Sequence, residues 1–167
     1  PLPNLLSHKF RLCPLFLLHQ GKHNTTKPFC LFVHHKAPHR NWLPAMEYLK
    51  LYEDVEFPLP ETFYDDYETR GDAAHRQRMH IGRDMHLVYD LKVHELADSL
   101  AGNDRWQLDI MNYTLAALSK EDGEKWLQAY ADMNRRYLEG GMSVNELYEW
   151  KYQRYVKDYL RCIKSVD

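Results

Sequence analysis

Residues 27–42 of the chain read KPFCLFVHHKAPHRNW, and this stretch decides the predicted fold class. Residues 29–35 form a short apolar run without polar alternation, which is typical of a strand buried on both faces of a parallel sheet. A polar loop follows over residues 36–43, and residues 45–51 then read as a short helix with Pro44 at its first turn. The order of strand, loop and helix predicts an α/β protein.

The loop concentrates side chains that suit the cleavage of an anionic ester. Ligands of open α/β sheets bind at the carboxyl ends of the strands, which is where this loop begins. Lys36 offers a point charge and Arg40 a two-pronged donor, while His39 can give a proton to a leaving oxygen near neutral pH. Pro38 stiffens the backbone before His39. The chemistry of the loop therefore fits a phosphate or sulfate ester.

Two less specific interpretations of the polar residues stay open. The string His34, His35 and His39 invites a metal site, but neighbouring residues of a strand point to opposite faces, so the three disfavour a single ion. From spacing alone, a basic surface loop is more often solvated than catalytic. An acidic turn lines a sugar pocket or, as we favour, is simply exposed; it contains Asp65, Asp66 and Arg70. Four further histidines lie in predicted helices and read as surface or partly buried residues: His75, His80, His86 and His94.

Helices are predicted for most of the remaining chain. Two prolines two residues apart enforce an extended connector over residues 55–60, with Phe57 and Leu59 along a surface groove. Helix-forming residues or apolar spacing then predict helices over residues 71–81, 84–100 and 108–118.

The last third of the chain carries the clearest signals. Ser119 with Asp122 three residues later opens one helix, and Gly140–Gly141 ends it. Ser143 with Glu146 is a capping box that opens another helix. Apolar residues recur along this final helix at a spacing of three and four, which predicts one core-facing stripe. The stripe consists of Tyr148, Tyr152, Tyr155, Tyr159, Cys162 and Val166.

Composition excludes several classes of protein. With 167 residues, 44% apolar and 28% charged, the chain is long enough for one globular domain. Its net charge of −2 is too close to neutral for a surface that binds nucleic acids or anionic membranes. Three cysteines are too few for a disulfide framework. Residues 12–18 are too short to span a bilayer, and no cleavage site of a secretory signal follows them. We interpret Pro1 as a cut end.

Residues 27–42 resemble the segment of type I sulfatases in which a buried strand runs into a K-A-P-H-R-x-W loop. The proline-rich residues 57–67 resemble the stretch that follows there, and residues 163–167 resemble the helix end before that family's D-N-x-G motif. The resemblance covers residues 27–167 and is nearest to sulfatases of glycan-degrading bacteria. Residues 1–26 do not share it, and we expect them to be atypical or disordered.

The resemblance implies an alkaline-phosphatase-like α/β fold, of which this chain is a mostly helical middle part with one or few buried parallel strands. It also implies a formylglycine nucleophile, a calcium ion that binds the sulfate, and a periplasmic or secreted protein. His39 would be the leaving-group acid, and Lys36 would contact the sulfate or orient the site. Arg40, Asn41 and Trp42 would contact the sugar, with Trp42 offering a face to the pyranose ring.

The chain departs from the family pattern in its nucleophile and metal motifs. Neither Cys13 nor Cys30 stands in the C-x-P-S-R motif that is oxidised to formylglycine, and no acidic pair has the context of a calcium ligand. We therefore expect hydrolysis of a sulfated amino sugar or glycosaminoglycan fragment by a full-length parent, with this segment inactive alone.

Two rival functions remain. One is a phosphoester or phosphonate hydrolase of the same superfamily. The other is a helical interaction module whose tyrosine-rich final helix binds a partner, which predicts that residues 119–167 oligomerise.

Overall fold

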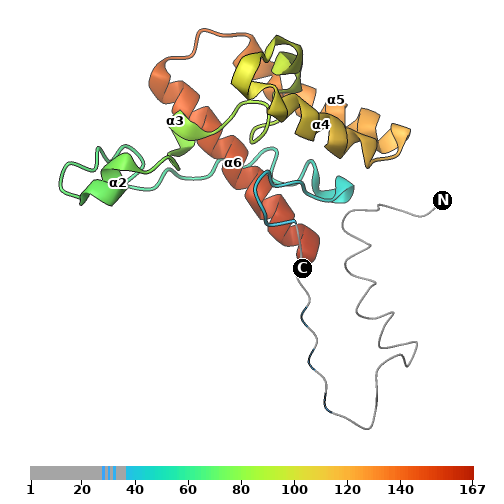
Figure 1. The fold of residues 1–167 in the computed structure, drawn as a ribbon, viewed down its shortest axis with the longest axis horizontal. Coiled ribbons are helices and arrows are strands. Elements are labelled where there is room, and N and C mark those ends of the chain that lie inside the picture. The colour runs from blue at the N-terminus through green and yellow to red at the C-terminus, as the bar shows by residue number, and fades with distance from the viewer. Residues whose placement is uncertain (1–27, 29, 31, 33–36) are drawn as a thin grey trace.

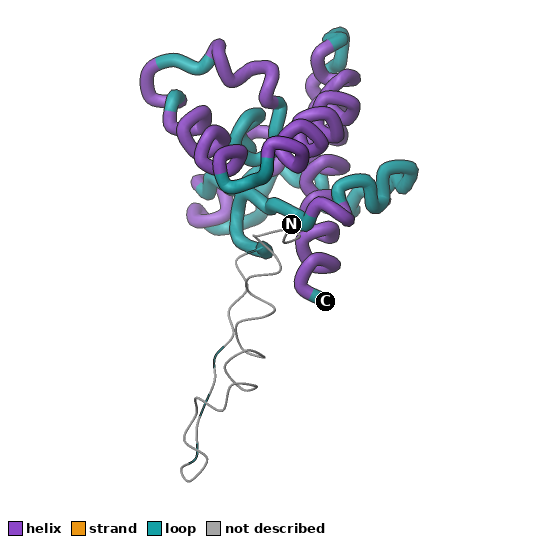
Figure 2. The backbone as a smooth tube through the Cα atoms, turned by 90° about the vertical axis from the view of Figure 1, so that its right-hand side faces the viewer, coloured by secondary structure: helices purple, strands orange, loops and turns teal. Residues whose placement is uncertain are grey.

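The structure, a computed structural model, describes residues 28, 30, 32 and 37–167. These residues form helices and loops and contain no strand (Figures 1 and 2). Segment 1–26 and most of the predicted strand, residues 29–35, lie outside the described residues. The elements, with η for a 3-10 helix, are η1 (Met46–Tyr48), α2 (Asp72–Arg76), α3 (Ile81–Asp84), η2 (His94–Ser99), η3 (Gly102–Asp104), α4 (Trp106–Ala116), α5 (Lys120–Leu138) and α6 (Val144–Val166).

The long helix α6 is the element on which the others are assembled (Figure 1). The short helix α3 packs against it so closely that a Cβ atom at Gly82 would lie 2.3 Å from Cγ of Tyr148. Only glycine permits this approach. Helix α6 also contacts η1, while α4 and α5 both contact η2.

The boundaries of α5 and α6 agree with the capping signals of the sequence. The Ser119 side chain accepts a hydrogen bond from the Asp122 backbone N–H at 3.1 Å. After α5 the chain turns through Gly140 and Gly141, which both have φ of 73°. Both hydrogen bonds of the capping box between Ser143 and Glu146 are present. Three predictions are thus confirmed.

The main apolar core lies between α5 and the segment that contains η1. Leu49, Trp126, Ala129 and Tyr130 are its buried residues. The partly buried apolar residues that surround it are Leu43, Met46, Leu115, Leu118, Leu127 and Met133. Helix α4, which spans Trp106–Ala116, agrees with the helix predicted for residues 108–118.

The helix predicted over residues 71–81 is wrong in its extent. Helix α2 ends at Arg76, and Gln77 is extended with ψ of 147°. The Gln77 side chain accepts a hydrogen bond from the Met79 backbone at 2.6 Å, and His80 caps the start of α3 through Arg83. Side chains that bond nearby backbone groups compete with the helix and end it here.

The helix predicted over residues 84–100 is also wrong. Residues 85–93 contain no helix and turn at residues 87–91, and only η2 follows. Lys92 has φ of 56°, which is incompatible with a right-handed helix. Asp90 accepts a hydrogen bond from the His86 backbone N–H at 2.8 Å, which closes the turn. The helix predicted over residues 45–51 shortens to η1.

The predicted apolar stripe of α6 does not identify its most buried face. Tyr159 is 36% exposed, whereas Cys162 is fully buried. The buried face lies one residue away and is mainly charged or polar. It consists of Lys151, Arg154, Asp158, Arg161, Cys162 and Ser165. The prediction looked for apolar residues only. It missed this face because charged side chains can also be buried when they pair with one another.

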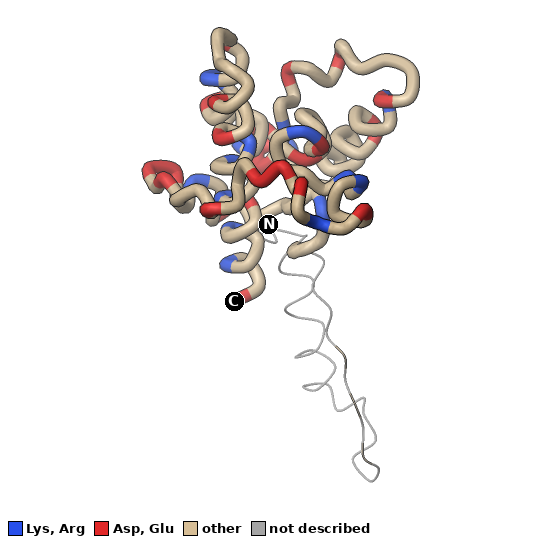
Figure 3. Tube along the Cα trace, turned by 90° about the vertical axis from the view of Figure 1, so that its left-hand side faces the viewer, with Lys and Arg blue, Asp and Glu red and all other residues tan. Residues whose placement is uncertain are grey.

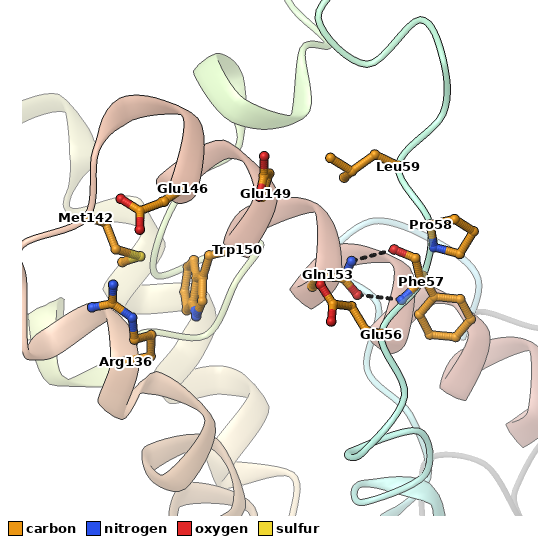
Figure 4. A pocket seen from close by; sticks show the side chains of 10 residues that line it. All are labelled: Glu56, Phe57, Pro58, Leu59, Arg136, Met142, Glu146, Glu149, Trp150 and Gln153. Carbon is orange, nitrogen blue, oxygen red and sulfur yellow. Dashed lines mark hydrogen bonds between the residues drawn. The ribbon is translucent and has the colours of Figure 1, made fainter.

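Residues 55–60, predicted as an extended connector, contain no helix or strand. The Gln153 side chain bridges it to α6 by accepting from Phe57 N at 2.9 Å and donating to Phe57 O at 2.6 Å (Figure 4). Phe57 and Leu59 line a groove, as predicted. No helix among the described residues is long and apolar enough to cross a membrane.

Candidate active site

The polar loop of residues 37–42 is held against α6 and the turn at residues 86–93. Trp42 N donates to His39 O at 3.0 Å, which closes the loop into a turn. Just after the loop, Ala45 N donates to Oγ of the α6 residue Ser165 at 2.9 Å. Lys36, the predicted sulfate contact, lies outside the described residues.

His39 is exposed at the tip of this turn. Its Nδ1 contacts the Arg40 carbonyl oxygen. A carbonyl oxygen only accepts hydrogen bonds, so this contact is a hydrogen bond when Nδ1 carries the proton. The exposed ring is accessible to a ligand from outside the turn.

Arg40 is fixed by a carboxylate that the sequence did not single out. Its Nε donates to Asp90 Oδ1 at 2.7 Å and its Nη2 donates to Asp90 Oδ2 at 2.6 Å. The Asp90 side chain is fully buried, whereas that of Arg40 is 46% exposed. The hydrogen bonds to Asp90 raise the pKa of Arg40, which keeps the guanidinium charged. Only the Nη1 edge is not engaged by Asp90.

Trp42 packs between α6 and the turn. Its ring lies edge-on to the ring of Tyr155 with centroids 4.8 Å apart, and the Lys92 ammonium stands 5.9 Å above it. Asn41 borders a cavity of about 10 Å³ that Lys92 and Trp126 also line. A space of this size holds about one water molecule and no sugar. This cavity is therefore not a sugar site.

A buried ionic network supports the loop from below. Asp158 accepts from Lys92 at 2.9 Å and from Arg161 at 3.0 Å, and Arg154 lies 3.9 Å away. Burial alone acts to raise the pKa of Asp158, but the three cations outweigh it and hold that pKa below its ordinary value. Burial lowers the pKa of Lys92. The ammonium over Trp42 is thus anchored to α6 through Asp158.

The large groove beside the connector does not fit an anionic ligand. It has a volume of about 540 Å³ and is shown in Figure 4. Its charged lining residues are three glutamates and one arginine: Glu56, Glu146, Glu149 and Arg136. The excess of carboxylates repels a sulfate group. Among residues 37–42 none lines this groove.

No group of three or more His, Cys, Asp and Glu side chains in the described part of the chain is arranged to hold a metal ion. The acidic turn is paired internally, because Asp65 accepts from Arg70 at 2.8 Å and from the Tyr67 backbone. Both bonds, the backbone one first, lower the pKa of Asp65. This arrangement agrees with an exposed structural turn.

The sequence identified the loop but missed its supports. Asp90 and Lys92 stand in a stretch that apolar spacing assigned to a helix, so no signal marked them. Asp158 is different, since Lys151, Arg154, Asp158 and Arg161 recur at the spacing of one helix face. A charged stripe with mixed signs at that spacing is a signal for a buried ionic network.

The chain is similar to known proteins over most of its length. No protein-family model matches the chain. An N-acetylglucosamine-6-O-sulfatase of Bacteroides thetaiotaomicron is 37% identical over 141 residues, which cover 84% of this chain and 25% of that protein. The solved structure of BT4656 in complex with its substrate D-glucosamine-2-N,6-O-disulfate superimposes with a TM-score of 0.81 at 32% identity. That match covers 96% of this chain and 31% of the BT4656 chain. The chain therefore spans about a quarter to a third of the length of these relatives.

Proposed function

Because the chain belongs to the sulfatase family, we propose that it supplies the leaving-group side of an active site that hydrolyses sulfate esters of amino sugars. The relatives act on or bind sulfated glucosamines, as the names N-acetylglucosamine-6-O-sulfatase and D-glucosamine-2-N,6-O-disulfate say, which supports this substrate class. The exposed His39 beside the fixed guanidinium of Arg40 is the observation that carries the proposal.

His39 donates the proton that the sugar oxygen needs when its bond to sulfur breaks. In the charged imidazole both ring nitrogens carry protons, so Nε2 can give one to the departing oxygen while Nδ1 stays bonded to the Arg40 carbonyl. Without this transfer an alkoxide would leave, which is unfavourable for a sugar alcohol. Proton transfer of this kind contributes about 10²–10⁴-fold to a rate.

The other loop residues bind the two ends of the substrate. Lys36 contacts the sulfate as a point charge, and the Nη1 edge of Arg40 donates to the sugar or to the sulfate. Asn41 and the outer side of Trp42 contact the pyranose ring. Asp90 holds Arg40 in one orientation, which lowers the entropy lost on binding.

The family resemblance also implies calcium, formylglycine and an exported protein. The described residues offer no cluster for the ion, and other segments of the parent protein would supply its ligands and the nucleophile. We propose a periplasmic or secreted location on the resemblance alone.

A chimeric enzyme tests the proposed function. Residues 27–167 would replace the corresponding segment of the Bacteroides thetaiotaomicron N-acetylglucosamine-6-O-sulfatase, and sulfate release from N-acetylglucosamine 6-O-sulfate would be measured. We expect release by the chimera and a loss of about 10²-fold or more in His39→Ala. His75→Ala, which removes an exposed histidine of α2, is the matched control. A folded chimera that releases sulfate from neither this ester nor the disulfated glucosamine would refute the proposal.

A further inference from the structure

We propose that Trp106, at the start of α4, is a sugar-stacking residue of the same site. This inference rests on the proposed function, since it names a residue that would bind the sugar of a sulfated substrate. The sequence did not identify Trp106 as a candidate. In the structure, contacts that begin at the loop residue Arg40 lead to it.

A continuous run of contacts joins the loop to Trp106. The Arg40 guanidinium stands 5.5 Å from the ring centroid of Tyr89, a geometry in which the cation is attracted to the ring. Tyr89 packs edge-on to Trp106 with centroids 4.9 Å apart. His86 packs edge-on to Trp106 from another position at 5.3 Å. The aromatic surface therefore continues directly from the arginine that Asp90 fixes.

Trp106 is both exposed and held in place. It is 37% exposed, and the two edge-on partners, Tyr89 and His86, support its ring. An aromatic ring that is already ordered loses little conformational entropy when a ligand stacks on it. A pyranose ring has apolar C–H faces and polar edges, so it can stack on an exposed aromatic side chain.

The other tryptophans of the chain are less suited to this role. Trp126 is 3% exposed and belongs to the core. Trp150 lies in the acidic groove of Figure 4, where carboxylates repel a sulfated ligand. Trp42 carries the Lys92 ammonium over its ring and meets Tyr155 at its edge, which leaves only its outer side for a sugar. Trp106 thus adds a second platform to the site.

Charge near Trp106 also fits a sulfated sugar. Arg40, whose guanidinium lies over the Tyr89 ring that packs on Trp106, supplies a positive charge, and its partner Asp90 is fully buried. Figure 3 shows that acidic and basic positions alternate along much of the described chain.

Indole N–H signals in a nitrogen-15 NMR spectrum of the whole 167-residue chain test the inference. Its four tryptophans give four such signals, which single Trp→Phe variants assign. Three ligands would be titrated: N-acetylglucosamine 6-O-sulfate, N-acetylglucosamine and inorganic sulfate. We expect the Trp106 signal to move with both sugars and not with inorganic sulfate, while the signals of Trp126 and Trp150 stay in place.

Variants of Trp106 separate stacking from folding. Trp106→Ala should weaken binding of the sulfated sugar about fivefold or more, the usual loss when a tryptophan anchor is truncated. Trp106→Tyr, which keeps an aromatic face, should restore most of it, and Trp150→Phe is the matched control. If the sulfated sugar shifts signals of the loop but not of Trp106, the inference is wrong and the proposed function stands. If neither sugar shifts any signal, both are contradicted.

Discussion

Asp90 determines the direction in which Arg40 points. The pair is bidentate, with a fully buried carboxylate and a half-exposed guanidinium, and Asp90 also accepts from the His86 backbone. A planar guanidinium that bonds a carboxylate through two parallel N–H groups is held in one plane. The geometry of the loop therefore depends on a residue that lies 50 positions away in the sequence.

Asp90→Asn should release Arg40 and destabilise the chain. The variant keeps the shape of the side chain but loses the charge, and disturbing a buried hydrogen-bonded acceptor costs about 1–3 kcal/mol. Urea unfolding measures this loss, and the Arg40 Nε–H signal in NMR should broaden or move. Asp65→Asn, which breaks the exposed pair with Arg70, is the matched control and should cost less. An unchanged Arg40 signal in Asp90→Asn would contradict the account.

Cys162 should be chemically inert in the folded chain. It is fully buried, and burial raises the pKa of its thiol to about 12. Since the thiolate is the reactive form, iodoacetamide at about pH 8 should leave Cys162 unmodified and label the exposed Cys30. Peptide mass spectrometry reads out both sites. Rapid labelling of Cys162 without denaturant would show that the helix face it occupies is not buried.

The same thiol gives a stability change at high pH. The folded pKa lies above the unfolded value of 9.0, so above that pH the unfolded chain releases the proton first. The contribution of Cys162 to the free energy of unfolding should therefore decrease as the pH rises from 9.0 towards about 12. Cys162→Ala should flatten this decrease.

At the scale of elements, α6 is the helix that connects the loop, the turn and α5. Its buried face bonds the turn through Lys92 and α5 through Asn134, which accepts from Arg154 at 3.0 Å. The same face bonds the Leu51 carbonyl through Arg161 at 2.7 Å. A helix that joins three segments in this way sets their relative positions by hydrogen bonds as well as by apolar packing.

Asp158→Ala should be strongly destabilising. It would leave Lys92, Arg154 and Arg161 buried without their shared carboxylate, and removing one partner of a buried ion pair costs about 3–5 kcal/mol. Lys164→Ala on the exposed side of α6 is the control and should change the free energy of unfolding by less than about 0.5 kcal/mol. A loss from Asp158→Ala no larger than that of the control would contradict the network.

The network also predicts acid sensitivity. The folded pKa of Asp158 lies below its ordinary value of 3.8, so its stabilising effect is complete above that value. The effect is lost as the pH falls through the folded pKa, because the protonated side chain no longer balances the buried cations. Thermal unfolding followed from neutral to acid pH should show a larger decrease in the wild type than in Asp158→Asn, which leaves other carboxylates with lowered pKa values such as Asp65.

Local signals in the sequence predicted the caps of α5 and α6 because those signals depend on residues within three positions. The turn at residues 85–93 was mispredicted because its shape depends on Asp90 meeting Arg40 and Lys92 meeting Asp158, contacts that are distant in sequence. The buried face of α6 was assigned one residue away for the same reason. The loop residues His39 to Trp42 were found from their chemistry, whereas Asp90 and Trp106 required coordinates.

At the scale of the whole molecule, the described residues form a helical body. Contacts through Tyr89 connect the loop residue Arg40 to Trp106. The chain spans only 25% of its curated relative, so the rest of an active site would come from other segments. The proposed role of this chain is therefore a partial one: it would bind the sugar and protonate its oxygen. The alkaline-phosphatase-like sheet that the resemblance implies remains a proposal, since the described residues contain no strand.

The most direct test of the central claim is the leaving-group dependence of the chimera described above. Its rate would be measured with His39 intact and with His39→Gln, on N-acetylglucosamine 6-O-sulfate and on an aryl sulfate with an acidic phenol as leaving group. A general acid matters for the weakly acidic sugar alcohol and little for the phenol. We therefore predict a loss of about 10²-fold or more on the sugar ester and a much smaller loss on the aryl ester. Equal losses on both substrates, or no loss on the sugar ester, would contradict the role of His39 as the leaving-group acid.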